Sequence, residues 1–186
     1  MSKKRWILLG AVVIGGVLVD QLTKQLAHAY VRGRGIVPVV DGFFELRYAR
    51  NPGAFFSLGA ELDPDLRRIV FVGASIAATV LLVRLYARAD ERQRLLRGAA
   101  MLLLAGALGN LVDRVLFGEV IDFAHLYWRD VLDWATFNVA DVLITAGLLM
   151  LVADVFVPRK AGAEGAAEPP ARPGGGHVQR TGETVP

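Results

Sequence analysis

Acidic side chains stand in or beside the apolar stretches of this chain, where a carboxylate is costly to bury. Asp20, Asp113 and Asp141 each lie within or at the end of such a stretch, and Asp122 follows one closely. A charged side chain in the hydrocarbon core of a membrane costs at least ~2.5–3.5 kcal/mol, so residues of this kind usually serve a function. The pattern therefore predicts an intramembrane acid site.

Asp122 and Asp141 are the best candidates for a catalytic pair. Asp122 lies just past the end of the third apolar stretch and Asp141 at the start of the fourth. Consecutive spans run antiparallel, so we expect both carboxylates at one membrane depth. Two carboxylates in contact in a low dielectric share one proton, and the pair can activate water while protonating a leaving amine. Such a pair can hydrolyse an amide without a covalent intermediate. For either aspartate taken alone, a helix N-cap is the alternative role.

The apolar stretches favour a membrane protein. The hydrophobic content of 54% and the mean hydropathy of +0.42 are high for a soluble domain. Each stretch reaches the ~18–20 residues of a membrane span only if it admits ionisable residues. A soluble four-helix bundle is the alternative, but it should show a polar stripe, and the first stretch is apolar on every side. We predict four transmembrane helices, around residues 6–19, 69–83, 98–112 and 142–153.

The distribution of basic residues predicts the orientation, because cytoplasmic loops are enriched in lysine and arginine. Basic residues occupy positions 3–5 before the first stretch and 159–160 after the fourth, and five arginines lie within 84–97. The loop after the third stretch has only Arg129 against four acids, and the loop after the first is mixed. Both termini and the middle turn are therefore predicted to be cytoplasmic.

The domain prediction is a membrane domain over residues 1–158 and a disordered cytoplasmic tail over 159–186. The tail is rich in Gly, Pro, Ala and Glu and has no apolar pattern. The N-terminus also imitates a cleavable signal peptide, but the polar segment 20–25 separates its apolar run from the possible cleavage site. We expect an uncleaved anchor. The chain has no cysteine, which excludes disulfides and a thiolate nucleophile.

The first outer loop, residues 31–65, is predicted to fold into a small β-sheet. Segments 37–40 and 43–48 are strand-like, and Asp41-Gly42 between them is a strong hairpin signal. Alternation of Glu45 and Arg47 with Leu46 predicts one polar and one apolar face. A loop without regular structure is the alternative. Aromatic residues suited to the membrane interface are Phe43, Phe44, Phe55 and Phe56.

Further polar residues cluster near the outer ends of the spans. Asp20 and Lys24 are four residues apart and share one helical face. Asn110 shares a face with Asp113 and with Arg114. The structural alternatives are a local ion pair for the first two residues and a self-neutralising Asp113–Arg114 pair within an interhelical network.

Other chemistries are less well supported. A serine mechanism would have to combine Ser57 with Lys24 as its base. A metal site could combine His125 with Asp122, but there is no HExxH motif. We therefore expect no metal, no cofactor and no nucleic-acid partner. A proton-coupled transporter and a non-catalytic membrane scaffold remain alternatives, although a transporter should carry polar groups through to the inner side.

Five sequence blocks in order resemble the bacterial lipoprotein signal peptidase (signal peptidase II) family. The likeness runs from about residue 6 to residue 157, and five blocks at compatible spacing are far more specific than any one. The blocks are Asp20-Gln21-Leu22-Thr23-Lys24, Asn51-Pro52-Gly53-Ala54-Phe55-Phe56, Gly106-Ala107-Leu108-Gly109-Asn110-Leu111-Val112-Asp113-Arg114, Val120-Ile121-Asp122-Phe123 and Phe137-Asn138-Val139-Ala140-Asp141.

This resemblance implies a four-span aspartyl endopeptidase of the bacterial inner membrane, with its active site toward the extracytoplasmic side. It implies removal of the signal peptide from a prolipoprotein, immediately before a diacylglyceryl-modified cysteine, and inhibition by the lipopeptide globomycin. Membrane lipid is the expected surrounding, and a monomer the expected state. The catalytic pair falls on Asp122 and Asp141. Matching supporting positions are Asp20, Lys24, Asn51, Gly53, Gly106, Asn110, Asp113, Arg114 and Asn138.

Two positions depart from the family pattern. Ala105 stands where a second glycine often precedes Gly106, and Phe55 replaces a commonly small residue. Neither touches the catalytic pair, but Phe55 puts the local shape of the pocket in question. The long tail matches no family feature.

Overall fold

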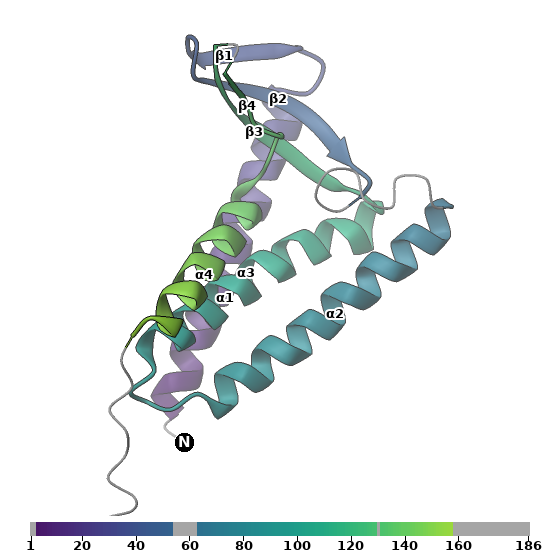
Figure 1. Ribbon diagram of the computed structural model, residues 1–186. Coiled ribbons are helices and arrows are strands. Elements are labelled where there is room, and N and C mark those ends of the chain that lie inside the picture. The colour runs from purple at the N-terminus through teal and green to yellow at the C-terminus, as the bar shows by residue number, and fades with distance from the viewer. Residues whose placement is uncertain (1–2, 54–62, 130, 158–186) are drawn as a thin grey trace, which may run out of the picture.

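The computed structural model describes residues 3–53, 63–129 and 131–157. In this part of the chain, helices α1 (Lys3–Tyr30), α2 (Pro64–Arg88), α3 (Arg94–Phe117) and α4 (Val139–Val155) form a bundle (Figure 1). Strands β1 (Ile36–Val40), β2 (Phe44–Asn51), β3 (Val120–Trp128) and β4 (Leu132–Asp133) form one sheet. The predictions for Phe55, Phe56, Ser57 and the tail lie outside the described residues.

Helix α3 is the centre of the bundle and packs against each of the other three helices. Its buried positions are mostly small, which lets neighbouring backbones approach closely without a hydrophobic driving force from lipid. Figure 1 shows α2 diverging from α4, with the sheet at the end of the bundle far from the N-terminus. The buried residues of α3 are Ala99, Ala100, Leu104, Ala105, Gly106, Gly109, Asn110 and Asp113.

Gly106 lies at a close approach of α3 to α4. A Cβ atom there would meet the carbonyl oxygen of Ala140 and come within 2.7 Å of Cγ1 of Ile144. We expect Gly106→Ala to cost about 1–3 kcal/mol through overpacking, and to displace the start of α4. Thermal unfolding in detergent measures this, with Gly15→Ala as the control because a Cβ atom there meets nothing within 4 Å. Equal melting temperatures for the two variants would contradict close packing at Gly106.

Three helices are long and apolar enough to cross a membrane, namely α1, α2 and α3. Helix α4 has 17 residues and spans about 26 Å at 1.5 Å per residue, slightly less than the hydrocarbon thickness. It is also the most uniformly apolar of the four in sequence. The structure therefore confirms a mainly helical membrane architecture, while the fourth span stays a prediction.

The sheet is antiparallel, in the order β1-β2-β3-β4. The hairpin predicted at Asp41-Gly42 is confirmed, with Val40 opposite Phe44 and Gly42 at a φ of 76°. The predicted polar face is wrong at Glu45, which is buried opposite His125 of β3. Strands β3 and β4 were not predicted; β3 pairs with the edge of β2 and so places the side chain of His125 directly beside that of Glu45.

Candidate active site

Lys24 occupies the centre of a fully buried polar cluster between α1 and α3. Its Nζ atom lies 2.8 Å from Asp20 and 2.9 Å from Asp113, and donates to Oδ1 of Asn110 at 3.0 Å. An ammonium group has three donors and no acceptor, so these contacts use its whole capacity. Lys24 pairs with Asp20 four residues earlier, as predicted. Asp113, on α3, forms its ion pair with this same lysine on α1.

The same lysine sets the orientation of Asn110. An ammonium group can only donate, so Oδ1 of Asn110 must face Lys24, and it accepts a second hydrogen bond from Asn138 at 3.1 Å. The amide nitrogen of Asn110 is then left to donate to Oδ1 of Asp141, at 2.9 Å. The buried Lys24 on α1 thereby orients the amide donor of Asn110 toward the carboxylate of Asp141 on α4.

The two acids paired with Lys24 also hold the backbone on either side of the site. Oδ1 of Asp20 accepts the backbone N–H of Ala140, the residue before Asp141, at 2.8 Å. Oδ2 of Asp113 accepts the N–H of Ile121, the residue before Asp122, at 3.0 Å. The residue before each candidate catalytic aspartate is therefore held by a hydrogen bond from its backbone N–H to a buried acid.

Asp141 is positioned by the start of α4. Asn138 is the N-cap of this helix and forms a capping box with Asp141, in which each side chain accepts the other's backbone N–H. The distances are 3.0 Å for the N–H of Asp141 and 3.1 Å for that of Asn138. A carboxylate in the first turn of a helix also faces the positive end of the helix dipole, which stabilises its negative charge.

Asp122 lies on strand β3 and is almost completely buried. Its oxygens accept hydrogen bonds from Asn138 at 2.6 Å and from Asn51 at 3.0 Å. Burial, together with the charge of Asp141, raises the pKa of Asp122 from 3.8 to about 6, against the opposing effect of these hydrogen bonds and of Lys24. The environment of Asp122 thus favours its protonated form more than water does.

Asn138 links the two acids directly. Its amide nitrogen contacts Asp122, while its amide oxygen accepts the N–H of Asp141. Asn51 reaches the site from the end of β2, and its own oxygen accepts the N–H of Gly53. Among the described residues, no group of three or more acidic or histidine side chains could hold a metal ion.

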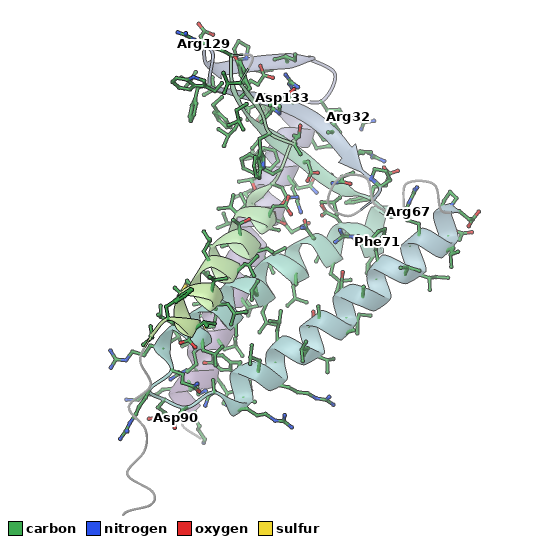
Figure 2. All side chains as sticks on the ribbon, viewed as in Figure 1. Arg32, Arg67, Phe71, Asp90, Arg129 and Asp133 are labelled. Carbon is green, nitrogen blue, oxygen red and sulfur yellow. The ribbon has the colours of Figure 1, made fainter. Side chains whose placement is uncertain are left out.

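Arg114 lies at the edge of the cluster. Its guanidinium donates to the carbonyl oxygen of Asn110 at 3.5 Å and lies 5.6 Å from the ring of Phe71, a cation–π distance. Figure 2 shows Phe71 near the start of α2, in the region between this helix and α3. The contact joins the divergent helix α2 to the polar cluster.

Asp122 and Asp141 both line a cavity of about 720 Å³. Its polar wall contains the two acids with Asn51, Asn110 and Arg114, while most of the remaining lining is apolar. That lining comes from α2, from α4 and from the β3–β4 hairpin. Such a cavity suits a substrate that is largely hydrophobic and reacts at one polar point. Its apolar members include Phe71, Ala74, Ala78, Leu126, Leu132, Trp134, Ile144 and Leu149.

Comparison with known proteins identifies the family. A family model described as signal peptidase (SPase) II matches residues 12–157. A lipoprotein signal peptidase of Geobacter sulfurreducens is 38% identical over 154 residues, covering 83% of this chain and 94% of the relative. One from Syntrophotalea carbinolica is 41% identical over 152 residues, covering 82% and 91%. The chain belongs to the signal peptidase II family.

Solved structures agree with this family assignment. Two structures described as bacterial membrane enzymes match with TM-scores of 0.70 and 0.68, each at 27% identity over 80% of this chain. The match covers 87% of the first structure's chain and 92% of the second's. The resemblance to signal peptidase II and the prediction of a peptidase are both confirmed.

The structure brings most of the predicted site residues into one network, with Gly53 and Gly106 at its margins. It also adds members that the sequence analysis missed. Gln21 donates to Asp113 at 2.9 Å and to the carbonyl oxygen of Gly109 at 3.1 Å. Its place within the first signal peptidase II block, between Asp20 and Lys24, was a usable signal. No local signal marked Leu132 or Trp134 as cavity residues.

Proposed function

We propose that this protein removes the signal peptide from bacterial prolipoproteins, cutting immediately before a diacylglyceryl-modified cysteine. The observation that carries the proposal is a pair of carboxylates on the wall of a largely apolar cavity. Family membership supports the same activity, since the relatives are named lipoprotein signal peptidases.

In the proposed mechanism the two aspartates divide the acid and base roles. Asp141, at the positive end of α4, is the ionised member and takes a proton from a water molecule. As the water oxygen adds to the scissile carbonyl carbon, Asp122 donates its proton to the carbonyl oxygen. When the tetrahedral intermediate collapses, Asp141 gives the proton it took from water to the amine of the lipidated cysteine, the C–N bond breaks, and Asp122 takes a proton back from a hydroxyl of the intermediate. No covalent enzyme intermediate is required.

The surrounding residues hold this pair in place. Asn51, Asn110 and Asn138 orient the carboxylates by donating hydrogen bonds. Asp20, Lys24 and Asp113 form the buried support beneath them, and Arg114 connects α2 to it. The N–H of Gly53 donates to the side-chain oxygen of Asn51, and Gly106 permits the contact of α3 with α4.

The apolar part of the cavity indicates how the substrate is held. The side chains of α2 that line it are small or aromatic, and those of α4 are aliphatic apart from Asp141 and Thr145. We infer that the substrate enters sideways from the bilayer between these two helices, since its acyl chains keep it in the membrane. The scissile bond is then carried to the depth of Asp122 and Asp141. The lipid environment is part of the binding site in this view.

The topology that fits this function has four spans, with both termini in the cytoplasm and the site toward the extracytoplasmic side of the inner membrane. The sheet and the α2–α3 turn lie at opposite ends of the bundle, which supports this arrangement (Figure 1). The arginine-rich turn is then cytoplasmic and the sheet lies outside. Residues 1–158 act as one membrane domain and monomer, with 159–186 as a cytoplasmic tail.

The pH dependence of cleavage should be bell-shaped, with a falling limb near pH 6. Activity needs a protonated Asp122, whose pKa is raised to about 6, so kcat/KM declines as the pH rises through that value. The hydrogen bond from Asn51 stabilises the ionised form. Replacing Asn51 with alanine should therefore move the falling limb to higher pH. A limb unmoved by this change would contradict Asp122 as the proton donor.

Dependence on the substrate's lipid tests the proposed function. Purified protein in detergent is given a diacylglyceryl-modified prolipoprotein and, separately, the same precursor without lipid. We expect cleavage of the lipidated form alone, and inhibition by globomycin. Equal cleavage of both forms, or none of either by folded protein, would contradict the proposal. In the second case, proton flux in liposomes would test a transporter instead.

A further inference from the structure

The β3–β4 hairpin has two chemically different faces. Tyr127 is paired with Asp133, and Trp128 with Leu132. The N–H of Trp134 donates to the carbonyl oxygen of Leu126 at 3.0 Å. Because side chains alternate across a strand, residues of even number point to one face and those of odd number to the other.

The even-numbered face borders the cavity. Leu126, Leu132 and Trp134 line the same cavity as the two catalytic aspartates. Leu132 is 44% exposed and Trp134 is 53% exposed, although both are large and apolar. Side chains of this kind, left uncovered beside an active site, form a wall that a substrate can cover.

The odd-numbered face contains a buried histidine. His125 is almost fully buried and its ring stacks on that of Tyr127, with 5.8 Å between the ring centroids. Its Nε2 atom lies 3.0 Å from Oδ1 of Asp133 and 4.0 Å from Oε1 of Glu45, which is itself in contact with Arg47. Neither ring nitrogen makes a directed hydrogen bond among the described residues. The contact with Asp133 is thus a close approach of Nε2 to a carboxylate oxygen, and it is an ion pair when the imidazole is protonated.

This contact joins the short strand β4 to the rest of the sheet. Strand β4 has two residues, and the chain reaches it through Arg129, which has a left-handed φ of 47°. So short a hairpin is marginal without side-chain contacts. Asp133 lies between Leu132 and Trp134 in sequence, so holding Asp133 also holds both cavity side chains.

We propose that His125 is a positioning residue that grips Asp133 and so keeps Leu132 and Trp134 in place as the outer wall of the substrate cavity. The wall contributes to the affinity for the lipidated precursor. His125 faces away from the aspartates and does not take part in the reaction. The expected effect on KM rests on the proposed function, whereas the contact of His125 with Asp133 does not.

The effect of the His125–Asp133 contact on the hairpin can be measured without an activity assay. The chain has no cysteine, so Val131→Cys, at an 83% exposed position in the hairpin loop, introduces a unique site for a spin label. We expect greater label mobility in His125→Gln and in Asp133→Asn, and near-normal mobility in His125→Lys, which places an ammonium group beside the two carboxylates. His28→Gln is the matched control, because His28 contacts Tyr48 of β2 rather than β4. Unchanged mobility in both neutral variants would overturn the grip.

The kinetic measurement tests what the grip does. Without the label, His125→Gln and Asp133→Asn should each raise KM for the lipidated precursor roughly fivefold, about the effect of one partly exposed ion pair, with kcat little changed. His125→Lys should restore KM, and Trp134→Ala should raise KM without increasing label mobility. A loosened hairpin with an unchanged KM would overturn the role of the wall. If the unaltered protein cleaves nothing, the proposed function fails, and the label experiment still decides the grip.

Discussion

Replacing Asp141 with asparagine is expected to lower kcat by more than about 10³-fold, because the side chain can no longer accept a proton from water. Asparagine nearly matches aspartate in shape and keeps an oxygen that can accept the N–H of Asn138, so the cap of α4 should persist. Cleavage of the lipidated precursor by purified variant protein measures the effect. Thermal unfolding in the same detergent shows whether the fold is retained.

Asp122→Asn should have an equally severe effect, for the complementary reason that the proton donor is lost. The combined variant should be no worse than either single change, because residues that act as a unit lose their function together. Asp90→Asn is the control, since Asp90 is exposed at the opposite end of the bundle (Figure 2). Substantial turnover by either active-site variant would exclude a catalytic aspartate pair.

Replacing Lys24 with methionine is expected to destabilise the protein by roughly 3–5 kcal/mol, the usual cost of removing one partner from a buried ion pair. Methionine fills a similar volume, so the effect isolates the charge. Asp20 and Asp113 would be left buried without their cation. Both hold peptide units next to the proposed catalytic aspartates, so activity should fall together with the melting temperature.

The matched control for Lys24 is Lys4→Met, a change of the same residue type on the same helix but at an exposed position. We expect that control to melt and to cleave like the unaltered protein. A melting temperature for Lys24→Met equal to that of the control would mean that the cluster adds nothing to stability. The reading of Asn110 as an oriented donor would then lose its support.

Sequence reasoning succeeded where the signal was local. The i,i+4 spacing placed Asp20 beside Lys24, and the Asp41-Gly42 turn located the first hairpin. Asp122 and Asp141 line one cavity, which agrees with the expectation that these two carboxylates lie close together.

Sequence reasoning failed where a contact joins distant segments. The pairing of Asp113 with Lys24 crosses from α3 to α1, and local spacing suggested Arg114 as its partner. Strand β3 follows α3 after only Gly118 and Glu119 and pairs with the remote strand β2, so its apolar start resembled the tail of a span. The burial of Glu45 follows from that same unforeseen pairing. The pairing of residues between remote strands depends on tertiary packing, and a short window of sequence does not show it.

The mass of the cleavage product tests the central claim most directly. Purified protein is incubated with a diacylglyceryl-modified prolipoprotein, and the mature product is analysed by mass spectrometry. We expect a single product that begins at the lipidated cysteine, absent from samples of Asp122→Asn and Asp141→Asn. A cut at any other bond, or the same product from either variant, would contradict an aspartate pair that cleaves before the lipidated cysteine.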